Sequence, residues 1–257
     1  MRHLEIRGLA VVIGAVLSIA ATTCYSAEKK VAQWSYGGAD GPAKWGLLDK
    51  AYEDCKFGEL QSPIDIPDAA ARKGDLPSLL FDYKAAPLKI IDNGHTIQVN
   101  YAPGSHVMVA GKKYELVQFQ FHRPSEEKIN GKGHDMAAHL LHKGPDGKHA
   151  VIAILLDTGA ESRLIKTLWD NLPKDKGKEN VVDAVTINAM DLLPKNKGYY
   201  TFSGSLTAPP CTEDVTWFIL KTPVTVSADQ IARFARYYPM NARPVQPVYG
   251  RDIQATR

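Results

Sequence analysis

The sequence lacks an excess of charge of either sign, and no part of it is set apart by composition. Its formal net charge is +3, from 31 Lys and Arg against 28 Asp and Glu. Nucleic-acid-binding proteins usually carry a clear basic footprint, so we expect no nucleic-acid partner. The chain has no internal repeat, low-complexity block or Pro/Gly/Ser-rich linker. At 257 residues, 44% of them hydrophobic, it is long enough to bury a substantial core.

Long apolar runs are also scarce. The one run, at 9–21, follows Arg2 and Arg7. It would span about 20 Å as a helix, against about 30 Å for a bilayer core, so we expect no membrane span. A positive start, a short apolar centre and small residues afterwards are typical of a signal peptide. We therefore predict that 1–27 is removed on export, which leaves a domain over 28–257 that is periplasmic or secreted.

Cysteine is the third scarce feature, with 3 residues in the chain. Cys24 lies at the end of the predicted signal peptide and leaves a lipoprotein anchor open, although the residues before it match that motif poorly. The exported domain keeps Cys55 and Cys211. In an oxidising compartment two cysteines can form one disulfide, and two free thiols are the alternative.

The pattern of apolar residues predicts a mainly β (α+β) fold. Several segments alternate with a period of two between Gly, Pro, Asn and Lys turns, which predicts strands at 95–101, 114–122, 136–142, 150–156 and 215–220. One helix is expected to carry Leu164, Ile165, Leu168, Trp169 and Leu172 on one face, and another to begin at a capping box formed by Ser227 and Gln230. Helices and strands do not alternate regularly, so we expect a largely antiparallel sheet with peripheral helices.

Residues able to bind a metal gather on two of these predicted strands. In the segment 118–122, which reads Gln-Phe-Gln-Phe-His, alternate residues share a face, so the polar side chains point away from the phenylalanines. The next strand can place His139 against that polar face. Two histidines on adjacent strands with a third donor form an open zinc site of three protein ligands and one water. Buried histidines bonded to their neighbours are the alternative, and this is how we interpret His142, which has the opposite parity.

A series of motifs along the exported domain resembles the secreted, bacterial-type alpha-class carbonic anhydrases. In order, they are Trp34-Ser-Tyr36, Gln61-Ser-Pro-Ile-Asp-Ile66, Asn93-Gly-His95, Gln118-Phe-Gln-Phe-His122, Pro124-Ser-Glu126, His139-Leu-Leu-His142, Ser205-Leu-Thr-Ala-Pro-Pro-Cys211 and Asn241-Ala-Arg-Pro-Val-Gln-Pro247. The resemblance implies one domain around a strongly twisted central sheet, with Zn²⁺ in a conical cleft. It also implies reversible hydration of carbon dioxide to bicarbonate and a proton by a zinc-bound hydroxide, with carbon dioxide and bicarbonate as the small-molecule partners.

The resemblance marks two departures at the metal. His122 and His139 match the second and third zinc histidines, and Gln120 stands where the first is expected, with its side-chain oxygen as the donor. Ala137 stands where the family usually has a glutamate that accepts the free N–H of the third histidine, whereas Gln118, which supports the first, is present. We expect both departures together to weaken zinc binding by about 5 kcal/mol, of which the missing glutamate accounts for about 1.4–2.7 kcal/mol. Glutamine is as neutral as histidine, so the zinc would keep its full effect on a bound water.

The remaining roles implied by the resemblance are catalytic and structural. Thr207 matches the threonine that accepts a hydrogen bond from the zinc-bound hydroxide, Glu126 the buried glutamate that holds that threonine's proton, and His95 the proton shuttle. Cys55 and Cys211 match the disulfide of secreted members. The wall of the carbon dioxide pocket is expected to consist of Leu141, Val151, Leu206, Ala208, Val215 and Trp217. The resulting expectation is a working but slower enzyme, with a catalytically silent binding protein of the same fold as the alternative.

Overall fold

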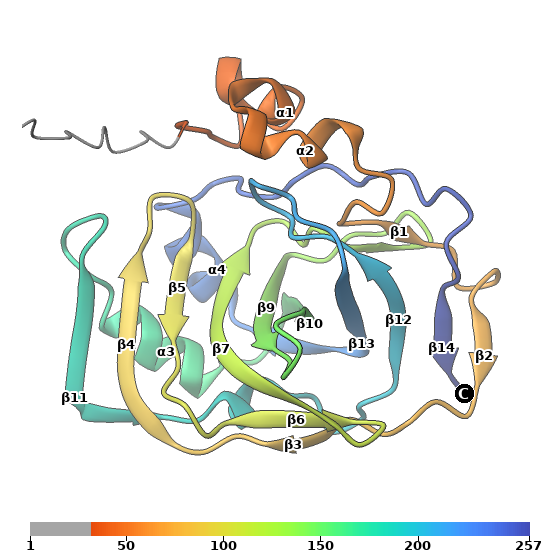
Figure 1. The fold of residues 1–257 in the computed structure, drawn as a ribbon. Helices are drawn as coiled ribbons and strands as arrows, with labels where there is room; N and C mark the ends of the chain where they lie inside the picture. Colours follow the sequence, from red (N-terminus) through yellow and green to blue (C-terminus); the bar gives the residue numbers. More distant parts are fainter. Residues whose placement is uncertain (1–31) are drawn as a thin grey trace, which may run out of the picture. The chain divides into compact units, whose positions relative to one another are not determined.

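The computed structural model describes residues 32–257, so the predicted signal peptide lies outside the described residues. A large twisted sheet dominates this part of the chain (Figure 1). Its strands run in the order β11-β4-β5-β7-β9-β10-β13-β12-β14-β2, and β6 pairs with both β7 and β3. The strand bounds are β1 (Asp65–Ile66), β2 (Arg72–Gly74), β3 (Leu80–Asp82), β4 (Ala86–Asp92), β5 (Ile97–Asn100), β6 (His106–Val109), β7 (Lys112–His122), β8 (Lys128–Ile129), β9 (Met136–Lys143), β10 (His149–Thr158), β11 (Glu179–Ile187), β12 (Tyr199–Gly204), β13 (Val215–Val226) and β14 (Gln254–Thr256).

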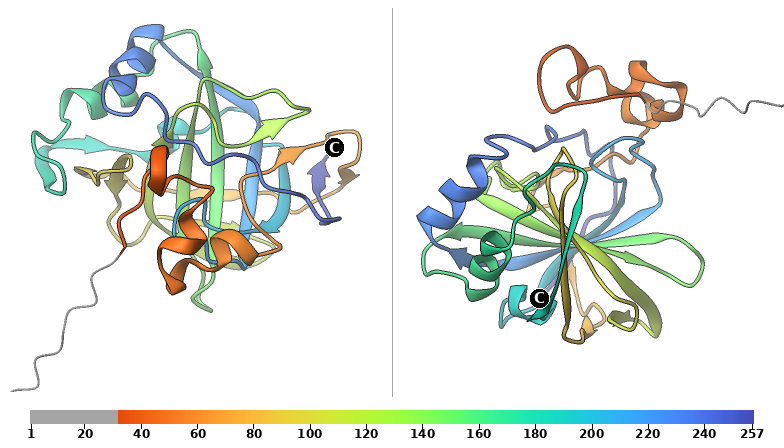
Figure 2. Two further views of the ribbon diagram at one scale, coloured as in Figure 1. Left: turned by 90° about the horizontal axis from the view of Figure 1, so that it is seen from above. Right: turned by 90° about the vertical axis from the view of Figure 1, so that its left-hand side faces the viewer.

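The pairing is mostly antiparallel, as the alternating pattern predicted. The exceptions within the large sheet are β10 with β13 and β14 with β2, which are parallel. A separate two-stranded sheet pairs β1 with β8, also in parallel. Two further views show how strongly the central strands twist (Figure 2). The fold is therefore mainly β, as expected.

The helices are short and peripheral. They are α1 (Trp45–Leu48), α2 (Asp54–Phe57), α3 (Arg163–Asp170) and α4 (Ala228–Ala235), with 3₁₀ turns η1 (Gly38–Asp40), η2 (Lys50–Tyr52) and η3 (Ala189–Leu192). The predicted capping box is present at α4, where Ser227 and Gln230 bond each other's backbone N–H. The predicted helix around 164–172 ends at Asp170, before Leu172. Pro173 explains the early end, because a proline disfavours helical geometry in the residue before it. No helix within residues 32–257 is long and apolar enough to cross a membrane.

The two faces of β7 serve different purposes. Phe119 and Phe121 are fully buried in the main apolar core, where α3 and α4 cover them. The Phe121 and Trp169 rings, for example, meet edge to face with their centroids 5.0 Å apart. The opposite face of the sheet has its own smaller apolar cluster, which includes Val151 and Trp217. Because side chains alternate along a strand, the aromatic residues of β7 lie in the core and its polar residues lie on the opposite face.

Buried His142 belongs to the core, as its parity predicted. Its Nδ1 donates to the carbonyl oxygen of Leu140 at 2.9 Å, so Nε2 accepts from the Tyr83 hydroxyl at 2.8 Å. Burial lowers the pKa of His142 to about 4. The histidine is therefore neutral and structural.

The segment with α1 and α2 lies beyond one end of the central strands (Figure 1) and is tied down covalently. A disulfide joins Cys55 of α2 to Cys211, in the loop after β12. The buried guanidinium of Arg243 reinforces this link, because it donates to the carbonyl oxygens of Cys55 and Ser62 and to the side chain of Gln61. The loop that follows β12 also carries Thr207, so this attachment helps to hold the candidate site in place.

Candidate metal centre

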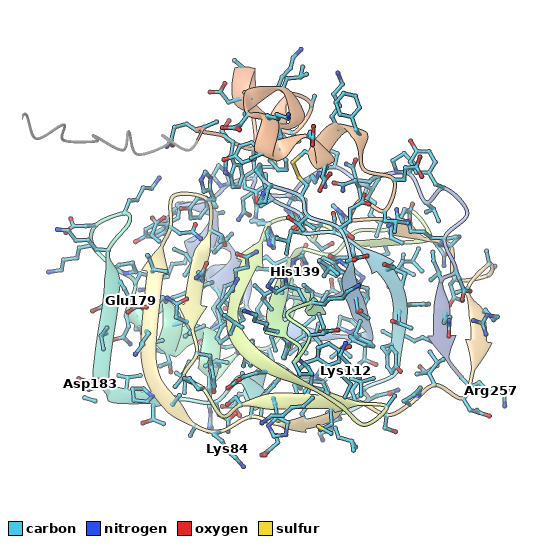
Figure 3. All side chains as sticks on the ribbon, in the orientation of Figure 1. Lys84, Lys112, His139, Glu179, Asp183 and Arg257 are labelled. Carbon is cyan, nitrogen blue, oxygen red and sulfur yellow. A yellow bond between two sulfur atoms is a disulfide. The ribbon has the colours of Figure 1, made fainter. Side chains whose placement is uncertain are left out.

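Cross-strand register assembles the site from neighbouring strands. Gln120 on β7 lies opposite His139 on β9, and His139 lies opposite Ala153 on β10. Figure 3 shows His139 among the central strands. The adjacent row along the same face contains Gln118, Leu141, Val151 and Trp217, from β7, β9, β10 and β13. These two rows lie side by side because successive residues on one face of a strand are two positions apart.

His122 has one nitrogen fixed by the protein and one left over. Its Nδ1 donates to the carbonyl oxygen of Asn241 at 2.9 Å, which leaves Nε2 with a lone pair. Nε2 lies 3.3 Å from Nε2 of Gln120. The ring is fully buried, and this burial lowers the pKa of His122 well below its ordinary value. A neutral imidazole with a free, oriented nitrogen is the form that binds a metal.

His139 is oriented in the same way, but by a carboxylate that the sequence did not lead us to expect. Its Nε2 donates to Oε2 of Glu127 at 3.1 Å, with the less well aligned Oε1 at 2.9 Å. Burial, the largest single effect, lowers the pKa of His139, but the charge and hydrogen bond of Glu127 and the charge of Glu126 together outweigh it, so that pKa is raised. The expectation that His139 lacks a carboxylate partner because residue 137 is alanine was therefore wrong: the partner comes from another segment of the chain. Nδ1 of His139 remains as the potential ligand atom.

Gln120 completes the group, but with the opposite end of its amide from the one expected. The nitrogen, not the oxygen, is the atom next to His122. Rotation about the last side-chain bond exchanges the two amide atoms and would present the oxygen instead. Gln118, on the same face, has a buried Oε1 without a hydrogen-bond partner among the described residues. A histidine N–H at position 120 is the donor that the resemblance would place beside this oxygen.

Glu126 lies next to both histidines. Its Oε1 accepts from the backbone N–H of Arg243 at 2.7 Å, and its oxygens lie 3.6 Å from Nδ1 of His122 and 3.7 Å from Nδ1 of His139. Burial raises the pKa of Glu126 to about 7, against the lowering effect of His139 and with a further raising effect of Glu127. Thr207 lowers that pKa slightly, although no well-aligned hydrogen bond joins its hydroxyl to Glu126, whose Oε2 is unpaired within residues 32–257.

The donor geometry is suited to a metal ion. The ligand atoms that His122, Glu126 and His139 can offer lie within 4.8 Å of one another, and all three residues are buried. Glu126 is already bonded by the Arg243 backbone, whereas the free nitrogen of His122 points to Gln120. Two imidazoles, each fixed through one nitrogen, with an amide beside them, match the open three-ligand arrangement of zinc. The residues present therefore fit Zn²⁺.

A cavity of about 170 Å³ opens beside these donors. It has a polar side, to which Gln118, Gln120, His139 and Thr207 contribute, and an apolar side formed by Leu141, Val151, Leu206, Ala208, Pro209 and Trp217. Five of the six expected pocket residues thus border it. Val215 does not: it is buried in the apolar cluster with Val151 and Trp217.

His95 lies outside this cavity lining. Its half-buried ring stacks on the Trp34 indole, with the two planes 5° apart and the centroids 3.7 Å apart. Burial lowers the pKa of His95, and the nearby charge of Lys176 lowers it further. At neutral pH this imidazole is therefore unprotonated, as a proton acceptor must be.

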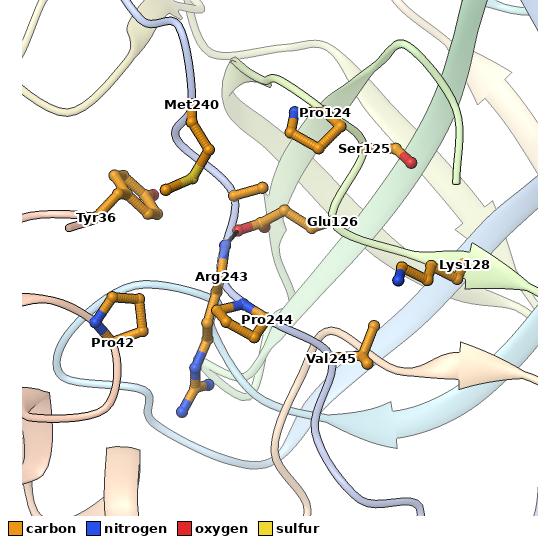
Figure 4. A pocket seen from close by; sticks show the side chains of 11 residues that line it. Tyr36, Pro42, Pro124, Ser125, Glu126, Lys128, Met240, Arg243, Pro244 and Val245 are labelled. Carbon is orange, nitrogen blue, oxygen red and sulfur yellow. Dashed lines mark hydrogen bonds between the residues drawn. The ribbon is translucent and has the colours of Figure 1, made fainter. Parts of the chain in front are cut away.

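Glu126 also borders a second, larger hollow of about 310 Å³ (Figure 4). Tyr36, Met240 and Arg243 contribute to its lining, together with several prolines. The guanidinium of Arg243 already bonds other parts of the chain. This hollow contains none of the histidines, so we place the candidate site in the smaller cavity.

Comparison with known proteins agrees with this geometry. A family model described as eukaryotic-type carbonic anhydrase matches residues 40–257. A carbonic anhydrase of Nostoc sp. is 39% identical over 245 residues, which are 93% of this chain and 92% of that protein. The structure of the alpha-carbonic anhydrase of Thermovibrio ammonificans with the inhibitor sulfanilamide is 38% identical, with a TM-score of 0.83 over 88% of this chain and 99% of that one.

A further relative has a different name. The crystal structure of a dioscorin complexed with ascorbate is 30% identical to this chain, with a TM-score of 0.81 over 87% of this chain and 97% of that one. The family match extends over most of the chain, and the fold agrees with it. The chain therefore belongs to the eukaryotic-type, or alpha, carbonic anhydrase family.

Proposed function

We propose that this chain catalyses the reversible hydration of carbon dioxide to bicarbonate and a proton, with Zn²⁺ held by His122, His139 and Gln120. The observation that carries the proposal is the orientation of the two histidines. One nitrogen of His122 is bonded to Asn241, and one nitrogen of His139 is bonded to Glu127. The second nitrogen of each ring is available to bind the metal. Zinc, when bound, acts as a Lewis acid that makes a water molecule nucleophilic near neutral pH.

The residues around the donors can position the reactants. The Thr207 hydroxyl borders the cavity and can accept a hydrogen bond from the nucleophile if its own proton is directed to the free Oε2 of Glu126. This arrangement aims a lone pair of the nucleophile at the substrate. The apolar wall formed by Val151, Leu141 and their neighbours suits a nonpolar gas, which needs a dry surface and no hydrogen-bond donor.

In this proposal the proton leaves through His95. This residue is half-buried and stacked on Trp34, and its lowered pKa leaves the ring unprotonated at neutral pH. We infer that it passes protons between the site and the buffer. We also infer export to the periplasm or beyond, because the disulfide between Cys55 and Cys211 needs an oxidising compartment.

Glutamine as the first donor favours a second candidate, a binding protein without catalysis. The amide nitrogen of Gln120 contacts Nε2 of His122, the atom that would bind the metal. A metal must displace this contact in order to bind. Without a bound metal, the cavity would remain but carbon dioxide hydration would be lost. The dioscorin relative, solved with ascorbate, shows that a protein of this fold can hold a small organic acid.

Metal analysis and stopped-flow carbon dioxide hydration on the zinc-loaded protein separate the two candidates. We expect close to one zinc per chain and a rate clearly above buffer. Thr207→Ala should lower that rate about a hundredfold, because the nucleophile loses its orientation. Thr186→Ala, on the exposed edge strand β11, is the matched control and should leave the rate unchanged. Zinc-saturated protein with no rate above buffer would replace the enzyme with the binding protein.

A further inference from the structure

We propose that Glu127 is the positioning residue for His139, in place of the carboxylate that the family usually has at position 137. This inference rests on the proposed zinc site. Ala137 is fully buried on β9, opposite His122, and its methyl group accepts no hydrogen bond. The carboxylate that meets Nε2 of His139 belongs instead to Glu127, in the segment just before β8.

Glu127 has no competing task among the described residues. Its side chain is fully buried, and His139 is its only hydrogen-bond or ion-pair partner in that part of the chain. A buried carboxylate is costly unless it is bonded or lies near a cation. A carboxylate at such a position, with a single histidine to contact, is therefore best explained by what it does to that histidine.

The backbone around Glu127 is held in place. The Ser125 hydroxyl donates to the carbonyl oxygen of Glu127 at 2.9 Å, and itself accepts from the backbone N–H of His134 at 2.8 Å. The next residue, Lys128, donates its N–H to the carbonyl oxygen of Ile64 at 3.2 Å. The carboxylate therefore reaches His139 from a fixed position and needs no rearrangement when a metal binds.

This contact determines which nitrogen of His139 faces the site. With the proton held on Nε2, the lone pair is on Nδ1, which lies 3.7 Å from Glu126 on the side of the other donors. A carboxylate partner also makes the imidazole a stronger donor, and loss of such a partner typically lowers metal affinity 10–100-fold. Glu127 would thus recover the affinity that Ala137 was expected to cost.

Zinc affinity, measured by competition with a chromophoric chelator, tests the assignment. Glu127→Ala should weaken Zn²⁺ binding 10–100-fold, and adding Ala137→Glu to that variant should restore most of the loss. Glu115→Ala, on the same sheet but bonded only to Gly104, is the matched control and should bind zinc like the natural chain. Equal zinc affinity in Glu127→Ala, or no recovery in the double variant, would overturn the inference.

A second readout uses the metal-free protein, so that it also decides the matter if the natural chain fails to bind zinc. Proton and ¹⁵N NMR of the imidazoles should show His139 as the Nε2–H tautomer, with a downfield-shifted proton that disappears in Glu127→Gln or Glu127→Ala. A His139 signal that both variants leave unchanged would refute the role of Glu127. Absence of zinc binding by the natural chain would instead count against the proposed function alone.

Discussion

Replacing Gln120 by histidine should strengthen zinc binding and speed carbon dioxide hydration. The position lies beside the free nitrogen of His122 and opposite His139, so an imidazole here joins the donors without a change of strand or face. Imidazole is a better zinc ligand than a neutral amide oxygen. Its second nitrogen would also supply an N–H on the face that carries the unpaired Oε1 of Gln118.

The magnitude follows from the partner of His139. Two departures were expected to cost about 5 kcal/mol, of which the missing carboxylate accounted for about 2 kcal/mol. Because Glu127 provides that hydrogen bond, about 3 kcal/mol remains for Gln120 alone. At about 1.4 kcal/mol per decade, Gln120→His should bind zinc about a hundredfold more tightly. An unpaired buried oxygen such as that of Gln118 costs about 1–3 kcal/mol. Because the new imidazole would also pair this oxygen, the hundredfold gain in affinity is a lower bound.

Chelator competition on both proteins measures the affinities, and stopped-flow hydration at saturating zinc measures the rates. Thr186→His, on the exposed edge strand β11, is the control and should change neither quantity by more than twofold. If Gln120→His bound zinc no more tightly than the natural chain, the amide would not be the weak donor of this site. If both proteins were inactive at saturating zinc, the assignment of the catalytic group would be wrong at another residue.

Four further predictions concern stability and proton transfer. Replacing Cys55 and Cys211 by serine should lower the free energy of unfolding by up to about 5 kcal/mol, measured by urea denaturation, because their disulfide closes a long loop; equal stability of the two proteins would contradict this. His142 is neutral in the folded chain, where its pKa is about 4. Between pH 6.5 and 4 the unfolded chain therefore binds more protons than the folded one, and the stability that His142 contributes is lost as pH falls through that window. The natural chain should therefore lose about 2 kcal/mol of its advantage over His142→Gln between pH 7 and pH 5, and a constant gap would refute the assignment. Trp34→Ala should raise the pKa of His95 in an NMR titration because it exposes the ring, and an unchanged pKa would contradict this. His95→Ala should slow hydration in dilute buffer until imidazole is added, and an unchanged rate would show that His95 does not transfer protons.

The sequence by itself determined the fold class and which side chains share a face. The period of two in β7 is a local property of the backbone, so it sends Phe119 and Phe121 to the core and Gln120 and His122 to the other face whatever the partner strands are. The opposite parity of His142 placed it in the core for the same reason. Local chemistry likewise determined the capping box at Ser227, because its two hydrogen bonds need only residues three apart.

Only the tertiary structure decided which residue supports each donor. Glu127 and His139 are 12 residues apart in the chain and belong to segments that pair with different strands, so no periodicity relates them. The same is true of Val215, which packs in the apolar cluster with Val151 and Trp217 and does not border the cavity. Contacts of this kind depend on the register and packing of distant strands, where a shift of one residue exchanges the two faces of a strand. A local pattern carries no information about that register, and for this reason the loss of a carboxylate at Ala137 could be read from the sequence while its replacement by Glu127 could not.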